Sequence, residues 1–350
     1  MKRNGYIDFI KFIFAVIVAE FHLNGGIFPG GRMAVEGFFI INGYFMMKSI
    51  EKDKANLNIG TSTVSFMWKK YKSLFYYLFP ATVISYIVIL LCNEKTLTYA
   101  IKRAPMLIFE IVPLYCTGLK GEYVVGVSWS LSAMLIALAI LFPLIKKFKR
   151  NFVLIACPLI VFLGYGTLSC FFGNMAVNKH YITDTIINAG VVRALAGCSL
   201  GCIMHELSKW VSLRKPTIFA KIMFTIVEAF AFTYFIYGMH HHSLSIYEYA
   251  IIPAIFVFMF VGINGLSYTS YLWNPKWTKP LGACSILIIL SHSCWTHYLK
   301  KELGAGYQKT IDVLWYILAV ALTSAAVYLL SLLLKFIFAK LSKIKLWKTA

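Results

Sequence analysis

Two ionisable side chains on the first apolar segment are the clearest candidates for chemistry. Lys11 and His22 are eleven residues apart, which in a helix places them within ~20° of one face and ~16 Å apart along the axis. Imidazole suits proton transfer at neutral pH. The structural alternative is a lysine that reaches the membrane interface and a histidine bonded to a neighbouring carbonyl.

A carboxylate begins the next apolar segment. Glu36 follows a glycine-rich turn and precedes Asn42-Gly43. It could pair with Lys11 or Arg32, or it could orient His22, because a short hairpin brings it near the outer end of the first segment. Gly43 is expected to allow close helix approach.

These residues need a membrane bundle to position them. The chain is 59% hydrophobic and 14% charged, which excludes an ordinary soluble domain. Its long apolar runs show no alternation, so helices are favoured over barrel strands. We predict an all-α polytopic helix bundle forming one domain over residues 1–350, with residues 104–115 interfacial or re-entrant. The ten predicted spans lie near 7–27, 34–48, 73–92, 125–145, 152–170, 186–205, 217–237, 248–265, 281–298 and 313–338.

The distribution of positive charge predicts the orientation. The net charge of +20 is concentrated in connections that become cytoplasmic if the N-terminus is inside, and the C-terminus then lies inside as well. Lys146, Lys147, Lys149 and Arg150 form one such group. Anionic lipid head groups are the expected partners, and nucleic acid is not expected.

No metal site is expected. The eight cysteines include no CxxC pair, and His240, His241 and His242 have no nearby acid or cysteine to complete a ligand set. They are assigned to an outward loop. Glu228, deep in an apolar segment, is a candidate transport acid or a partner for Arg193.

Further motifs follow along the chain. After Asp8–Lys11 and His22, the first motif is an acid before a phenylalanine pair in Val35–Phe39, followed by Asn42–Tyr44. The second is a basic segment that ends in proline, Phe66–Pro80 with Lys69, Lys70 and Lys72. The last three are a tryptophan motif at Trp129–Leu131, an arginine-to-glycine span with Arg193 and Gly201, and a late Gly-x-x-Ser…His span with Gly282, Ser285 and His292.

In their order and over nearly the whole chain, these motifs resemble the acyltransferase 3 family of integral membrane acyltransferases, in its stand-alone form without an appended periplasmic hydrolase-like domain. Three positions depart from that pattern. Lys11 stands where arginine is commoner, which removes bidentate recognition of phosphate or carboxylate. Asn42 replaces serine, and Met134 stands where many members have glutamate.

The resemblance implies a multi-pass protein of the bacterial inner (cell) membrane with no bound cofactor. It implies an acyl-CoA donor, most often acetyl-CoA, and a hydroxyl of a carbohydrate acceptor such as exopolysaccharide, capsule or O-antigen. His22 is expected to be the base or a transient acyl carrier, with Glu36 orienting it. Lys11 is expected to bind the donor together with Lys69, Lys70 and Lys72. The candidates for the substrate path are Asn42, Tyr44, Trp129, Arg193 and His292.

Two other classes of protein compete with this interpretation. A transporter or flippase for a glycan or small metabolite would use Lys11, Glu36, Glu228 and Arg193 along a translocation route. Against it, the sequence has no internal repeat and no matching broken helices in two halves. A structural scaffold protein would leave the intramembrane charges unexplained.

Overall fold

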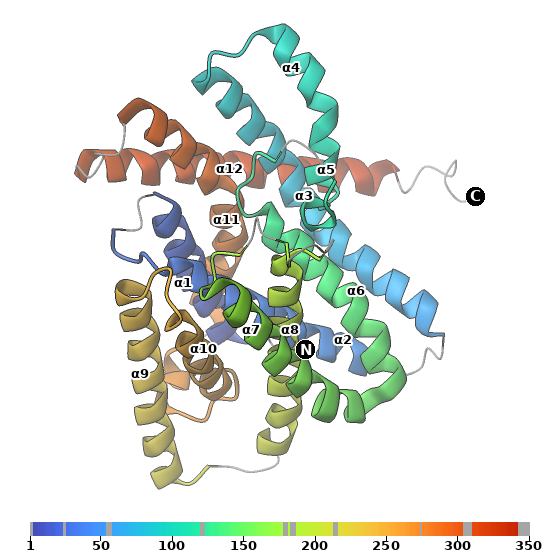
Figure 1. The fold of residues 1–350 in the computed structure, drawn as a ribbon, viewed down its shortest axis with the longest axis vertical. Coiled ribbons are helices and arrows are strands. Elements are labelled where there is room, and N and C mark those ends of the chain that lie inside the picture. Colours follow the sequence, from blue (N-terminus) through green and yellow to red (C-terminus); the bar gives the residue numbers. More distant parts are fainter. Residues whose placement is uncertain are drawn as a thin grey trace. The chain divides into compact units, whose positions relative to one another are not determined.

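The computed structural model describes residues 3–23, 26–53, 58–119, 123–177, 181–182, 187–212, 216–273, 275–303 and 310–341. Within these ranges the regular structure is helical, with no β-strand. Figure 1 shows the helices coloured in chain order. By its internal contacts the chain divides into two compact units. The first comprises residues 1–67, 113–119 and 129–285, and the second comprises residues 68–112, 120–128 and 286–350.

The first unit holds most of the helices. Two of them, α3 and α11, continue into the second unit. The elements are α1 (Gly5–Leu23), η1 (Gly31–Met33), α2 (Ala34–Lys52), the start of α3 (Ile59–Cys92), η3 (Tyr115–Thr117), α6 (Ser128–Asn151), η4 (Phe152–Ala156), α7 (Cys157–Phe172), α8 (Ala189–Ser212), α9 (Ile218–His241), α10 (Glu248–Ile263), η5 (Tyr268–Leu272) and the start of α11 (Pro275–Leu303).

The second unit contains the rest of α3 and α11 and a set of short helices. Those are α4 (Leu97–Arg103), η2 (Ala104–Leu107) and α5 (Ile108–Ile111), followed at the end of the chain by α12 (Thr310–Leu341). Residues 104–115 therefore form only short turns of helix, which agrees with the prediction that this segment does not span.

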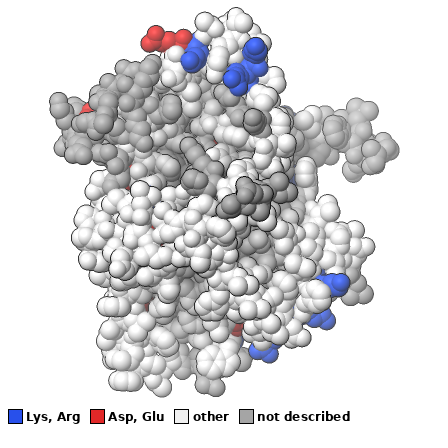
Figure 2. Space-filling view, viewed as in Figure 1, with Lys and Arg blue, Asp and Glu red and all other residues white. Residues whose placement is uncertain are grey.

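The predicted all-α membrane bundle is confirmed. Each predicted span overlaps a helix, and residues 24–25 of the first span and residue 186 of the sixth lie outside the described residues. Within the described residues, five helical stretches are long and apolar enough to cross a membrane, and α10 is a shorter apolar helix. Figure 2 shows a face on which most described atoms belong to uncharged residues. The five long stretches are Ile59–Cys92, Ser128–Phe172, Ala189–Ser212, Ile218–His241 and Asp312–Leu341.

One of these stretches contains a sharp turn at Lys149. Its backbone has φ 53° and ψ −137°, which is not helical and is uncommon for a residue with a side chain. The regular helical backbone of α6 is therefore interrupted at the basic residues, and the chain continues through the π-helical η4 into α7. The predicted break between two spans lies where the positive charges are.

Small residues set the contact between α2 and α8. A Cβ added at Gly43 would lie 1.9 Å from the carbonyl oxygen of Cys198, and one added at Gly201 would lie 2.0 Å from that of Ile40. Both distances are far inside van der Waals contact, so only glycine fits. The close helix approach expected at Gly43 is confirmed, and it brings the start of α2 against α8.

Candidate functional site

A buried carboxylate lies at the start of α2, and α8 supplies its cationic partner. Glu36 is 0% exposed and Arg193 is 1% exposed. The Arg193 Nε donates to Glu36 Oε1. Tyr165 on α7 donates its hydroxyl to Glu36 Oε2 at 2.5 Å. A buried ion pair in a membrane helix needs such satisfaction of its polar atoms, because an unpaired charge there is costly.

The remaining guanidinium donors of Arg193 bind two loops. Nη1 donates to the carbonyl of Met175 at 2.9 Å, and Nη2 donates to the carbonyl of Arg32 at 2.9 Å. The guanidinium carbon lies 5.4 Å from the centre of the Trp129 ring, within cation–π range. Arg193 thus joins α2, α6, the 174–176 loop and the η1 turn.

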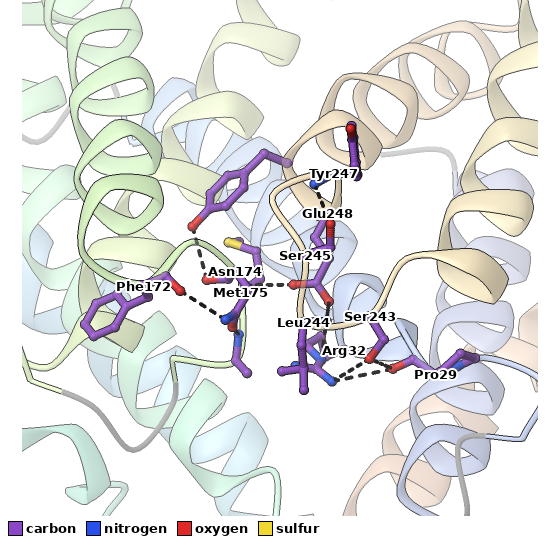
Figure 3. Close-up of polar contacts among 12 residues, drawn as sticks. Pro29, Arg32, Phe172, Asn174, Met175, Ser243, Leu244, Ser245, Tyr247 and Glu248 are labelled. Atoms are coloured by element: carbon purple, nitrogen blue, oxygen red, sulfur yellow. Dashed lines mark hydrogen bonds and ion pairs between the residues drawn. The ribbon is translucent and has the colours of Figure 1, made fainter.

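A second buried acid holds the same loops from another helix (Figure 3). Glu248, in the first turn of α10, accepts from the backbone amide of Met175 at 2.7 Å and from that of Leu244 at 3.2 Å. Its Oε1 also lies 3.7 Å from Arg32 Nε. Arg32 donates further to the Ser243 hydroxyl at 3.2 Å. The η1 turn, the 174–176 loop and the loop before α10 are therefore fixed to one another.

This fixed turn packs against the end of α1 that carries His22. The ring of His22 is half-buried and lies 5.1 Å from the ring of Phe21. The Arg32 guanidinium carbon lies 5.1 Å from the centre of the same Phe21 ring. A Cβ added at Gly31 would lie 2.7 Å from Phe21 Cβ, so the turn sits closely on this residue. The contacts connect Arg193 to the imidazole through Arg32 and Phe21.

Lys11 lies farther along α1, where α2 provides an aromatic surface. Its side chain is half-buried, and Nζ is 5.3 Å from the centre of the Phe45 ring. Lys48 approaches the same ring at 6.0 Å and the Tyr44 ring at 4.3 Å. Two ammonium groups thus approach one aromatic ring, that of Phe45. Lys48 is a cationic neighbour that the sequence analysis did not single out.

The other predicted donor-binding lysines belong to α3 in the second unit. Lys69 and Lys72 are exposed and Lys70 is half-buried. Their exposure is compatible both with binding a phosphate and with simple retention at a cytoplasmic surface.

The candidate path residues have separate surroundings. Asn42 donates to the Phe38 carbonyl of its own helix at 2.8 Å, and Tyr44 packs edge-on against His205 at 5.3 Å between ring centres. Trp129 and Arg193 lie together at the buried ion pair. His292, in the second unit, is 0% exposed, and its Nδ1 lies 3.1 Å from the Ile288 carbonyl, as expected of a buried, hydrogen-bonded helix residue.

Two expected pairings do not hold. Glu36 pairs with Arg193 rather than with Lys11 or Arg32, because the small residues of α8 bring Arg193 directly against the start of α2. Glu228 is not the partner of Arg193, since it accepts from the Thr269 hydroxyl at 2.7 Å. Within the described residues no cluster of histidine, cysteine, aspartate and glutamate could hold a metal ion.

Tyr165 and Glu248 also belong to this site but were not predicted from the sequence. Glu248 carried the signal that identified Glu36, namely an acid in the first turn of an apolar span. Tyr165 carried none, since a tyrosine within an apolar helix is indistinguishable from a packing residue until its hydroxyl partner is known.

Comparison with known proteins gives one match. A family model described as an acyltransferase domain matches residues 4–332. Searches of curated proteins and of solved structures gave no match.

Proposed function

The chain belongs to the acyltransferase 3 family of membrane acyltransferases, and on that premise we propose that it is an O-acetyltransferase. It takes an acetyl group from acetyl-CoA on the cytoplasmic side and transfers it to a hydroxyl of a carbohydrate in the bacterial inner membrane or at its surface. The observation that carries the proposal is the support around His22. A half-buried imidazole ends α1 against a turn that Arg193 and Glu248 hold in place.

His22 acts as the general base. Its neutral imidazole accepts the proton of the acceptor hydroxyl while the oxygen attacks the thioester carbonyl. The C–S bond then breaks, and the CoA thiolate takes the proton back from the imidazolium. General base catalysis of this kind contributes about 10²–10⁴-fold in rate.

Glu36 is a positioning residue in this proposal. Both of its carboxylate oxygens accept hydrogen bonds, one from Arg193 and one from Tyr165. Because Arg193 also binds the Arg32 carbonyl, Glu36 orients His22 through the η1 turn. This route needs no direct contact between the carboxylate and the imidazole.

Lys11 binds the phosphates of the donor, with Lys48 beside it. Lys69, Lys70 and Lys72 of the second unit stay predicted donor contacts on the grounds of the sequence alone. The support is the convergence of the Lys11 and Lys48 ammonium groups on the Phe45 ring. Charge-assisted hydrogen bonds to an anion contribute about 1.5–3 kcal/mol. Lys11→Met should therefore raise the KM for acetyl-CoA about tenfold or more and leave kcat nearly unchanged.

The deciding experiment measures CoA release from acetyl-CoA by the purified protein in detergent, with a membrane glycan extract as acceptor. His22→Ala should lose the activity, while His241→Ala, an exposed histidine on α9, should keep it. Activity that persists in His22→Ala would remove the catalytic assignment. If CoA does not bind the wild-type protein at all, a transport function replaces the enzymatic one.

A further inference from the structure

The second unit contains a cavity that none of the residues discussed above lines. It lies between the C-terminal part of α11 and the first turns of α12 and has a volume of about 360 Å³. That volume falls within the range of small-molecule sites. Aromatic side chains dominate the described lining, which also has one acid: Trp295, Tyr298, Trp315, Tyr316 and Asp312.

Two of these rings are held in a defined geometry. The indole Nε1 of Trp295 donates to the Thr323 hydroxyl on α12 at 2.8 Å. The Tyr298 ring stands at 90° to the indole with its centre 6.1 Å away, an edge-to-face arrangement favoured by aromatic quadrupoles. These contacts set the positions of two rings on the α11 side of the cavity.

The acid of the cavity is open to a ligand. Asp312 is half-buried in the first turn of α12. It has no hydrogen-bond or ion-pair partner among the residues that the structure describes. A carboxylate accepts hydrogen bonds and donates none when ionised, so it fits a ligand that brings O–H or N–H donors.

We propose that this cavity binds a sugar ring of the acceptor, an inference that rests on the proposed transfer to a carbohydrate. A pyranose has faces of apolar C–H groups and an edge of hydroxyls. The C–H face stacks on the indole and phenol rings, and one or two hydroxyls donate to the Asp312 carboxylate. Trp and Tyr suit such a ligand because each combines a large apolar surface with a polar tip.

Two other ligands fit less well. A lipid tail would leave the half-buried carboxylate without a partner, which is unfavourable. A quaternary ammonium ion fits a cage of rings that closes around it. Here Trp315 is 63% exposed, so the aromatic wall is open on one side. A pyranose needs such an opening because its hydroxyls point outward from the ring.

Saturation-transfer difference NMR on the full chain in detergent tests the proposal without any donor. The probes are D-glucose, D-galactose, N-acetyl-D-glucosamine and L-rhamnose at millimolar concentration, with choline as the cationic comparison. Irradiation of aromatic protons should saturate the ring C–H protons of at least one sugar. Trp315→Ala and Asp312→Asn should each weaken that sugar's affinity about tenfold, equivalent to about 1.4 kcal/mol.

The control is Trp210→Ala, which removes a tryptophan of similar exposure, 59%, on α8, and should leave the signal unchanged. His22→Ala should also keep it, so that loss of catalysis and loss of binding are separable. The proposal is overturned if no sugar gives a signal, if Trp210→Ala weakens it as much as Trp315→Ala does, or if only choline binds.

Discussion

Arg193 and Glu36 form an ion pair that membrane and protein together remove from water. Their exposed fractions are 1% and 0%, so water solvates neither charge. Removing one partner of a buried pair costs about 3–5 kcal/mol, because the other charge is left without compensation. Breaking the ion pair is therefore strongly unfavourable, and the pair fixes the register of α2 against α8.

Glu36→Gln should accordingly destabilise the protein by about 3–5 kcal/mol and lower its thermal unfolding temperature in detergent. The matched control is Glu206→Gln, whose partners Arg150 and Lys209 are 72% and 43% exposed. That substitution should cost less than about 1 kcal/mol. Equal shifts for the two variants would show that the buried pair has no special role in stability.

A second residue-scale prediction concerns Glu110 on α5, outside the long apolar helices. Its carboxylate is 0% exposed and accepts from the backbone amides of Val124 and Val125 at 3.0 and 2.9 Å. Burial raises the pKa of Glu110 from 4.5 to about 7, although the amide hydrogen bonds act in the opposite direction. The folded protein thus binds a proton that the unfolded chain has already released.

Because the folded-state pKa is the higher one, the stabilisation is complete below about pH 4.5 and is lost as pH rises through about 7. At 1.36 kcal/mol per pKa unit, the change is on the order of 3 kcal/mol. Unfolding temperatures measured between pH 4.5 and 8 should therefore fall across this window in the wild type and fall less in Glu110→Gln. A control, Glu94→Gln at an exposed position, should follow the wild type; a pH profile unchanged by Glu110→Gln would contradict the assignment.

Residue types alone predicted some members of the candidate site but not the contacts among them. Lys11, His22 and Glu36 were predicted because an ionisable group in an apolar segment is conspicuous. The partner of Glu36 was not predicted correctly, since pairing depends on which helices approach one another. Glu36 pairs with Arg193, 157 residues away; a sequence distance of this size leaves no local signal. The supporting contacts of Tyr165 and Glu248 depend on the same packing.

At the scale of elements, the α2–α8 contact should be sensitive to a single methyl group. A Cβ at Gly201 would meet the Ile40 carbonyl oxygen at 2.0 Å, and backbone atoms cannot move aside as a flexible side chain can. Overpacking of this kind typically costs about 1–3 kcal/mol. Gly201→Ala should lower the unfolding temperature and, because Arg193 lies on the same helix, should also lower the proposed acetyl transfer.

Gly166→Ala provides the control for that substitution. It lies in helix α7, and a Cβ there would meet nothing within 4 Å. Alanine should then be neutral or stabilise by up to about 1 kcal/mol through its higher helix propensity. If both alanine variants behave alike, close approach at Gly201 does not govern the packing of α2.

The elements themselves were largely predictable, for a physical reason. Backbone groups in lipid must be satisfied within the segment, so an apolar run of sufficient length has to be a helix. This is why each predicted span overlaps a helix. The boundaries were less predictable: α3 begins at Ile59 rather than near residue 73, because its first turns carry polar residues that hydropathy assigns to a loop. The break near Lys149 was predicted, because the cluster of basic residues there marks a connection between two spans.

At the scale of the whole molecule, the predicted orientation connects the charge distribution with the chemistry. The donor in the proposed function is a cytoplasmic acyl-CoA, so Lys11 can bind it only if the basic connections are inside. Green fluorescent protein fused after Ala350 should fluoresce, because it matures in the cytoplasm. Alkaline phosphatase fused after His241 should be active, because it needs the oxidising outer side. The opposite pattern would place Lys11 on the outer side and His22 toward the cytoplasm, and the donor-binding role of Lys11 would fail even if His22 proved essential.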